Sequence, residues 1–278
     1  MNNRIISAIV IAASLIIFIL LSGVPFVMNL TVALIAASAL YEVLIVTKYI
    51  ESKSLIVISI VFAFIIPFIP VIPFVPDFTR TAFTLGIFAF TMVLFITLLA
   101  AYETFSLEHL SVVFLMSIII PFFFSTLIYS RQMDAGFYNL LYIFLCAWAC
   151  DSGGYIFGRM FGRHKLTPKI SPKKTVEGAF GGVAASIVTT ICLCYIIDVF
   201  DANITVDYAV VVIYSLIGGI FAILGDLSAS VIKRNFGVKD FGKLIPGHGG
   251  IMDRFDSVLF VAPMMYLSLY LYPVFIMI

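Results

Sequence analysis

The sequence predicts an all-α polytopic membrane protein with about nine transmembrane helices and a cytoplasmic N-terminus. Hydrophobic residues fill 63% of the 278 positions and charged residues only 11%, whereas soluble domains are about half apolar and about a quarter charged. Apolar stretches recur along the whole chain, and a helix needs roughly 20 such residues to cross about 30 Å of hydrocarbon. The net charge is only +1 and by itself says nothing about nucleic acid, whereas the distribution of charge is informative. We expect no nucleic-acid partner.

Nine apolar stretches are long enough to be considered as spans: 5–22, 28–47, 55–75, 80–101, 110–129, 137–157, 178–199, 208–229 and 257–277. The first is too long for a typical signal-peptide core, and no small-x-small cleavage site follows it, so we expect a retained span. The third carries four prolines in and after its second half, at positions 67, 70, 73 and 76, which predict a kinked helix end or an extended loop. Because all four cysteines lie in apolar runs (Cys146, Cys150, Cys192 and Cys194), we expect buried free thiols.

The basic residues predict the orientation of the chain. With the N-terminus in the cytoplasm, 14 of the 16 lysines and arginines fall on the cytoplasmic side, and only Arg80 and Arg131 fall outside. This bias follows the positive-inside rule. Two long polar loops, 158–177 and 230–256, then share the cytoplasmic side. We therefore expect residues 1–135 to be a transmembrane scaffold and residues 136–278 to be the catalytic region with these two loops.

Three polar residues recur on one face at the end of the eighth predicted span. Asp226, Ser230 and Lys233 are spaced i, i+4 and i+7, so a helix places them together. Ionisable residues within spans usually face a polar cavity, and a carboxylate beside a hydroxyl suits a hard cation such as Mg²⁺. The alternative is a carboxylate that simply pairs with Lys233 at the membrane edge.

A glycine-rich segment follows, in which Gly249 and Gly250 come after His248, and Asp253 and Asp256 open the ninth predicted span. Glycines let the backbone approach a ligand, and successive free amides can cradle an anion. Carboxylates interleaved with lysines and arginines have the composition of a phosphate site bridged by metal. The alternative is a solvated loop of mixed charge.

The upstream polar loop carries a second basic cluster. Ser171, Pro172 and Glu177 fit the opening of a helix, with proline in its first turn. The adjacent Lys173 and Lys174 would then hold nucleotide phosphates beside the free amides of the helix N-terminus. The alternative for these lysines is contact with anionic lipid heads. Small residues favour close helix packing, which is our interpretation of the glycines at 181, 182, 218 and 219.

These residues together resemble the signature of the phosphatidate cytidylyltransferases, also called CDP-diacylglycerol synthases. The match is Ser230-x-x-Lys233-Arg234-x4-Lys239-Asp240-x-Gly242-x3-Pro246-x-His248-Gly249-Gly250-x-x-Asp253-Arg254-x-Asp256. The stretch Ser171-Pro172-Lys173-Lys174-Thr175-x-Glu177-Gly178 is similar to a second stretch of the family. The chain departs from many bacterial relatives at Ala229, Val176 and Gly154, where glutamate, an aromatic residue and alanine are common.

The resemblance implies transfer of a cytidylyl group from CTP to phosphatidate, which gives CDP-diacylglycerol and pyrophosphate for phospholipid synthesis. It also implies Mg²⁺ on Asp226 and Asp253, a second cation such as K⁺, and a homodimer in the membrane with its site on the cytoplasmic side. Charge on the reacting phosphates would be shared by five basic residues, Lys173, Lys174, Lys233, Arg234 and Lys239. Asp240 and Asp256 would support them, and His248 would donate to the leaving group or order the loop. The expected substrate-binding positions are Ser171, Thr175, Ser230, Gly249, Gly250 and Arg254.

Two other classes of function fit parts of this sequence. Another CTP-dependent lipid enzyme, of the polyprenol kinase or CDP-archaeol synthase type, is the nearest alternative. An ion-coupled transporter would use Asp226 and Glu42 as intramembrane carboxylates, but its charges would not cluster on one face as these do. Glu42 itself has no obvious partner in the sequence.

Overall fold

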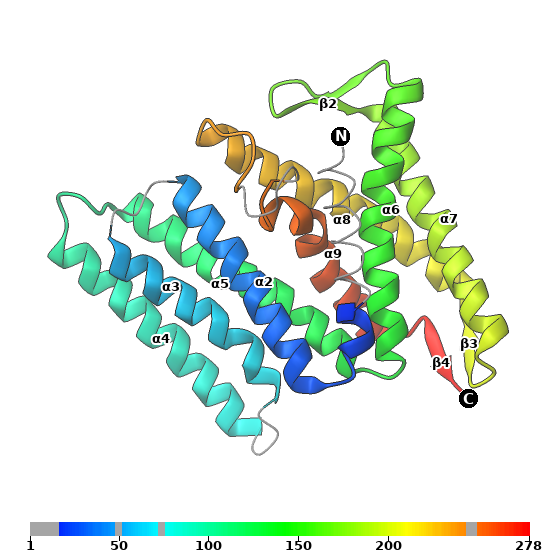
Figure 1. Cartoon of the computed structure of the whole chain (residues 1–278), viewed down its shortest axis with the longest axis horizontal. Coiled ribbons are helices and arrows are strands. Elements are labelled where there is room, and N and C mark those ends of the chain that lie inside the picture. The colour runs from blue at the N-terminus through cyan, green and yellow to red at the C-terminus, as the bar shows by residue number, and fades with distance from the viewer. Residues whose placement is uncertain (1–16, 48–51, 72–75, 243–248) are drawn as a thin grey trace. The chain divides into compact units, whose positions relative to one another are not determined.

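The computed structural model describes residues 17–47, 52–71, 76–242 and 249–278 (Figure 1). The chain forms two compact units, of which the first comprises Met1–Ile128 with Asp240–Asp253 and the second Tyr129–Lys239 with Arg254–Ile278.

The first unit is built mainly from α2 (Pro25–Thr47), α3 (Lys53–Ile65), the 3₁₀ helix η1 (Ile66–Val71), α4 (Pro76–Ala100) and α5 (Leu107–Gln132). The second is built from α6 (Gly136–Phe161), β1 (Lys165–Thr167), β2 (Ser171–Thr175), α7 (Val176–Phe200), β3 (Ile204–Val206), α8 (Tyr208–Asn235), most of α9 (Met252–Leu271), and β4 (Phe275–Met277).

Most of the predicted spans are confirmed as helices. Six described helices are long and apolar enough to cross a membrane: Phe26–Val46, Thr81–Ala100, Leu107–Gln132, Gly136–Phe161, Val176–Phe200 and Tyr208–Asn235. The chain is therefore an all-α polytopic membrane protein, because a helix satisfies its own backbone hydrogen bonds in lipid. Most of the predicted first span lies outside the described residues, so the total of nine stays a prediction.

The third predicted span is a shorter helix followed by a 3₁₀ turn. The α-helix ends at Ile65, and η1 continues through the first prolines. Proline lacks the amide hydrogen that an α-helix requires, so the proline-rich half cannot continue the helix. Both α3 and η1 pack against α2 in the first unit, and the Asn29 side-chain amide of α2 donates to the Pro67 carbonyl.

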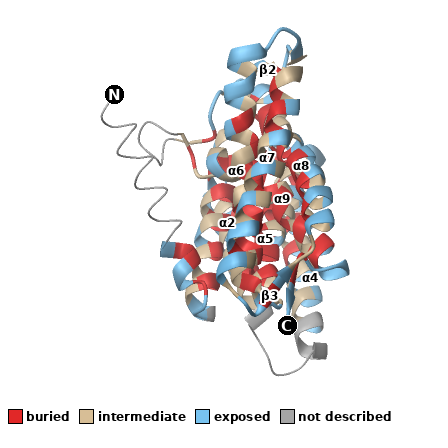
Figure 2. Cartoon of the chain, turned by 90° about the vertical axis from the view of Figure 1, so that its right-hand side faces the viewer, coloured by how far each residue is buried: buried red, intermediate tan, exposed pale blue. Residues whose placement is uncertain are grey.

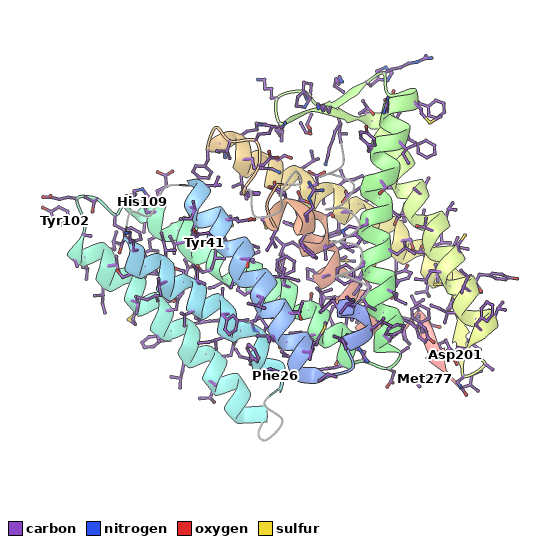
Figure 3. All side chains as sticks on the ribbon, viewed as in Figure 1. Phe26, Tyr41, Tyr102, His109, Asp201 and Met277 are labelled. Carbon is purple, nitrogen blue, oxygen red and sulfur yellow. The ribbon has the colours of Figure 1, made fainter. Side chains whose placement is uncertain are left out.

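His109 takes part in the cap of α5. Its Nδ1 accepts the Ser106 amide at 2.9 Å, and its own amide donates to Ser106 Oγ at 3.4 Å. This reciprocal arrangement resembles a capping box with histidine in place of glutamate. Figure 3 labels His109 beside Tyr102 at the turn between α4 and α5.

In the second unit, α6, α7 and α8 pack closely, and glycines allow that approach. A Cβ at Gly182 of α7 would lie 2.6 Å from the Cys150 carbonyl oxygen of α6, and a Cβ at Gly219 of α8 would lie 3.1 Å from Val183 of α7. Small residues of this kind let membrane helices come into backbone contact. Figure 2 shows how buried and exposed positions alternate along these helices. The packing interpretation of the glycines is confirmed.

We expect Gly182→Ala to lower the free energy of unfolding by about 1–3 kcal/mol, because the new methyl group collides with backbone on α6. Thermal unfolding in detergent micelles measures this effect. Gly154→Ala is the matched control on the same helix pair, since its Cβ would lie 3.5 Å from the Gly178 carbonyl oxygen, an ordinary contact. Equal melting temperatures for the two variants would contradict the packing argument.

Two predicted helix boundaries are wrong. Ser171 and Pro172 do not open a helix but lie in β2, which pairs antiparallel with β1, and α7 starts only at Val176. The helix starts there because the Thr175 side chain accepts the Gly178 amide at 3.1 Å and so acts as its N-cap. The ninth span does not continue as a helix to residue 277.

Proline at position 273 follows the last turn of α9, which ends at Leu271. Residues Phe275–Met277 form β4, which pairs antiparallel with β3 and brings Met277 to the end of the unit where Asp201 lies (Figure 3).

Among the cysteines, Cys146, Cys150 and Cys194 are buried free thiols as predicted, but Cys192 is exposed, so the prediction of burial is wrong for Cys192. Cys192 lies on the outward side of α7, where neighbouring helices do not cover it.

Candidate active site

The second unit contains a cavity of about 400 Å³ that is lined by both charged and apolar residues. Its wall is formed by the end of α6, the β1–β2 hairpin, the start of α7 and the middle of α8. The lining residues are Cys150, Asp151, Gly154, Tyr155, Gly158, Arg159, Leu166, Lys173, Lys174, Thr175, Gly178, Ala179, Gly182, Ile223 and Asp226. Four predicted site residues, Lys173, Lys174, Thr175 and Asp226, therefore lie around one space.

The two predicted charge clusters meet in an ion pair. Lys174 Nζ lies 2.5 Å from Asp226 Oδ2, and the two side chains are about one quarter exposed, at 25% and 28%. The pair joins the hairpin to α8 across 52 positions of sequence, so neither local pattern could have predicted it. Asp226 thus pairs with Lys174, and the alternative of a simple pair with Lys233 is not what the structure shows.

The predicted face of α8 is confirmed, because this helix continues unbroken to Asn235. Ser230 Oγ donates to Asp226 Oδ1 over a long 3.4 Å. Ser230 and Lys233 are both buried, with 7% and 8% of their surface exposed. A buried ammonium requires nearby negative charge, and Lys233 attracts the carboxylate of Asp256 at the start of α9.

Three carboxylates of the second unit interact electrostatically, namely Asp151, Asp226 and Asp256. Asp256 is buried, with 7% of its surface exposed. Asp151 lies on α6, lines the cavity and accepts the Ser257 hydroxyl at 2.7 Å, which ties α9 to α6. Like charges held together need cations to balance them, and Lys174, Lys233 and Arg254 supply three.

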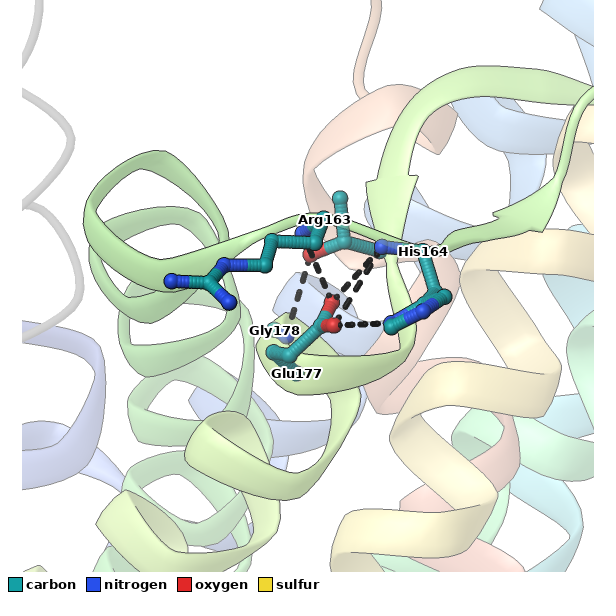
Figure 4. Close-up of polar contacts among 5 residues, drawn as sticks. Arg163, His164, Glu177 and Gly178 are labelled. Carbon is teal, nitrogen blue, oxygen red and sulfur yellow. Dashed lines mark hydrogen bonds and ion pairs between the residues drawn. The ribbon is translucent and has the colours of Figure 1, made fainter.

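The hairpin that carries Lys173 and Lys174 is fixed at its base by Glu177, in the first turn of α7. The Glu177 carboxylate accepts the backbone amides of Arg163 and His164 at 3.1 and 3.2 Å, and it contacts His164 Nδ1 at 2.6 Å (Figure 4). A carboxylate in the first turn also suits the helix dipole. Glu177 therefore positions the hairpin beside the cavity.

Arg234 braces the same hairpin from α8. Its Nε donates to the Ile170 carbonyl and its guanidinium nitrogen to the Val238 carbonyl, both at 3.1 Å. Arg234, Lys239 and Arg254 are exposed, and Ser171 lies in β2; none of these four lines the cavity. Their predicted contacts with substrate stay predictions.

The glycine-rich segment belongs to the first unit. Asp253 Oδ2 accepts two amides, from Phe241 at 2.8 Å and from Gly250 at 3.0 Å, and so holds these two residues at one carboxylate oxygen. Gly249 has a φ of +84°, which glycine adopts without strain. Asp240 is exposed at the start of this segment, and His248 falls within 243–248, outside the described residues.

No group of three or more His, Cys, Asp or Glu side chains able to hold a metal ion occurs among the described residues. Asp226 and Asp253 fall in different units. Their joint role as metal ligands stays a prediction.

Comparison with known proteins decides the family. The sequence profile described as the cytidylyltransferase family matches residues 2–272. The chain belongs to the cytidylyltransferase family.

Three curated relatives are similar to about half of this chain, and each bears the name phosphatidate cytidylyltransferase. The protein of Staphylococcus haemolyticus is 48% identical over 137 residues, which are 49% of this chain and 50% of the relative. Those of Staphylococcus aureus and Staphylococcus epidermidis are 48% identical over 130 residues, 47% of this chain and 48% of each relative. The chain thus matches about half the length of these relatives.

In this cytidylyltransferase family member, Asp151 lines the cavity although it is not among the site residues predicted from the sequence. Its signal was present, because an ionisable side chain within an apolar span is a candidate site by default. The cavity-facing Tyr155 and Arg159 follow it at i+4 and i+8 on the same face of α6. The helical spacing from Asp151 could have identified all three.

Proposed function

We propose that the chain transfers the cytidylyl group of CTP to phosphatidate and so forms CDP-diacylglycerol and pyrophosphate. The single observation that carries this proposal is the cavity lined by Lys173, Lys174, Asp226 and Asp151, in which Lys174 pairs with Asp226, in a chain of the cytidylyltransferase family. Basic residues facing carboxylates suit a substrate that carries several phosphates. The relatives' name, phosphatidate cytidylyltransferase, supports the same lipid acceptor.

The reaction needs little proton chemistry. An ionised phosphate oxygen of phosphatidate forms a bond to the α-phosphorus of CTP, and the bond from that phosphorus to the bridging oxygen of the β-phosphate breaks. The bonding electron pair leaves with pyrophosphate. Phosphoryl transfer of this kind depends mainly on positioning and on neutralising charge. Lys173 and Lys174 would bind phosphate oxygens at the cavity wall, and Lys233 would balance the carboxylates behind them.

The ion pair of Lys174 with Asp226 fits that role. It keeps the ammonium at the wall before substrate arrives, so less side-chain freedom is lost on binding. Glu177 and Arg234 hold the hairpin on which the two lysines lie. Both lysines therefore extend from a fixed strand.

The oxygen donors at the site suit Mg²⁺, which prefers carboxylate and other oxygen ligands. Asp226 would hold the ion with help from Asp253, while Asp240 and Asp256 are candidates for supporting a second cation such as K⁺. When bound, Mg²⁺ would supply charge neutralisation for the triphosphate. The Ser230 hydroxyl keeps the Asp226 carboxylate oriented.

The site is proposed to face the cytoplasm, where CTP is available. Fourteen of the 16 lysines and arginines lie on that side in the proposed topology. The phosphate of phosphatidate lies at the same leaflet boundary. We also propose that the protein acts as a homodimer.

Purified protein in lipid nanodiscs tests the proposal when supplied with phosphatidate, Mg²⁺ and CTP labelled at either the α- or the γ-phosphate. We expect the α-label in the lipid product and the γ-label in pyrophosphate. Transfer of the γ-label to a polyprenol would instead indicate a kinase. Use of an unsaturated archaeal-type ether phosphatidate in preference to phosphatidate would indicate the archaeol-type synthase. Absence of any labelled lipid would overturn the proposal.

A further inference from the structure

Glu42 is a buried carboxylate in the second half of α2, with only 3% of its surface exposed. It accepts two backbone amides through two different oxygens. Oε1 accepts the Ile251 amide at 3.0 Å, and Oε2 accepts the Met252 amide at 2.9 Å. These amides lie 209 and 210 positions further along the chain, within the same compact unit.

The two amides lie at the N-terminus of α9, which begins at Met252. The first amides of a helix have no partner within it, and a negative charge is favourable beside them. Glu42 therefore caps α9 from a distant helix. Asp253 and Asp256 lie in the first turns of α9. Because Glu42 fixes the start of this helix, it also helps to fix where these two carboxylates lie.

The loop also lies against the Glu42 carboxylate at its two glycines. A Cβ at Gly242 would collide with Oε1, and a Cβ at Gly250 would collide with Oε2. The backbone on both sides of the 243–248 segment therefore approaches the same carboxylate. Glycine at these two positions therefore lets the carboxylate stay where it accepts the amides, because an added methyl group would force it to move.

Asp253 completes the arrangement by accepting the Phe241 and Gly250 amides through Oδ2. Four backbone amides, of Phe241, Gly250, Ile251 and Met252, are thus held by two carboxylates, one from α2 and one from α9. Charge-assisted hydrogen bonds of this kind are about twice as strong as neutral ones. The backbone geometry at these four amides therefore depends on both carboxylates.

We propose that Glu42 is a positioning residue for cytidylyl transfer, which holds residues 241–242, residues 250–251 and the start of α9 in the arrangement the reaction needs. The inference rests on the proposed function for its catalytic consequence, but the clamp itself is independent of it. α2 then affects the reaction through the first turn of α9, which carries Asp253.

Glu42→Gln is the principal test, because glutamine keeps the size of the side chain but has one acceptor oxygen instead of two. We expect kcat to fall about 10-fold, and about 10- to 100-fold in Glu42→Ala, which removes both acceptors. Asn29→Ala is the matched control. Asn29 is equally buried on the same helix, with 1% exposed, but donates to Pro67 and does not contact the loop. It should lower thermal stability while kcat of the folded protein stays within about twofold.

Hydrogen exchange gives a readout that does not depend on activity. Glu42→Gln should speed exchange at the Ile251 and Met252 amides by about 10-fold or more, while Ala209 and Val210, which Asp207 caps at the start of α8, stay unchanged. Uniformly faster exchange in both regions would reduce Glu42 to a general stability role and overturn the proposal. Unchanged exchange at Ile251 and Met252 would overturn it too.

Gly242→Ala tests the same contact from the other side. The added methyl group should displace the Glu42 carboxylate and lower kcat about 10-fold or more. In the double variant with Glu42→Ala the collision is absent, so the combined loss should be clearly smaller than the product of the two single losses. Losses that multiply would contradict the clamp. If the wild-type protein transferred no cytidylyl group, the proposed function would fail, and the exchange experiment would still decide the clamp.

Discussion

Asp226→Asn should lower kcat/KM for cytidylyl transfer by about 10²- to 10³-fold, the usual effect of removing one preorganised charge at a transition state. Asparagine keeps the shape and can still accept the Ser230 hydroxyl, but it has no charge to hold Lys174 at 2.5 Å or to attract a cation. Initial rates of CDP-diacylglycerol formation, measured across a range of Mg²⁺ concentrations, check this. The variant should also require more Mg²⁺ for half-maximal rate.

Asp198→Asn is the matched control for charge. Asp198 accepts the Tyr208 hydroxyl at 3.0 Å near the end of α7 and does not line the cavity. We expect its rate to stay within about twofold of the wild type, since an exposed polar contact contributes little. If Asp226→Asn retained more than a tenth of the wild-type kcat/KM, Asp226 could not be the charged centre of the site.

The helical part of this fold follows from the sequence because hydrocarbon cannot hydrogen-bond the backbone, and a helix satisfies its own peptide groups. A run of about 20 apolar residues must be helical in lipid, and α2, α4 and α6 begin and end within a few residues of the predicted spans. The face that joins Asp226, Ser230 and Lys233 was predictable for the same reason. Helical spacing needs only that the helix continues, which α8 does to Asn235.

The parts that were not predictable depend on contacts between distant segments. The β1–β2 hairpin has short strands of three and five residues, too few for a clear alternation of apolar and polar side chains. The partner of Glu42 lies more than 200 positions away. Lys174 was predicted as a phosphate ligand from its neighbours alone, and its pairing with Asp226 required the folded chain.

Lys174→Gln should lower kcat/KM for CTP by about 10- to 150-fold, the equivalent of the about 1.5–3 kcal/mol that a hydrogen bond to a charged group contributes. The variant removes one positive charge from the cavity wall and leaves the Asp226 carboxylate without its ion-pair partner. Most of the loss should appear in KM for CTP if the ammonium binds triphosphate equally in the ground and transition states, and in kcat if it binds the developing charge.

Lys169→Gln is the matched control, because Lys169 lies in the turn of the same hairpin, is exposed, and does not line the cavity. Both variants lose one charge near the membrane surface, where each basic residue contributes about 1 kcal/mol to anionic lipid binding. A lysine that merely contacts lipid heads would therefore give equal losses in both variants, and these losses would depend on the anionic lipid content of the nanodisc. A loss confined to Lys174→Gln and independent of that content assigns the lysine to the nucleotide. Because Lys174 and Asp226 contact each other, the double variant Lys174→Gln with Asp226→Asn should lose much less than the product of the single losses.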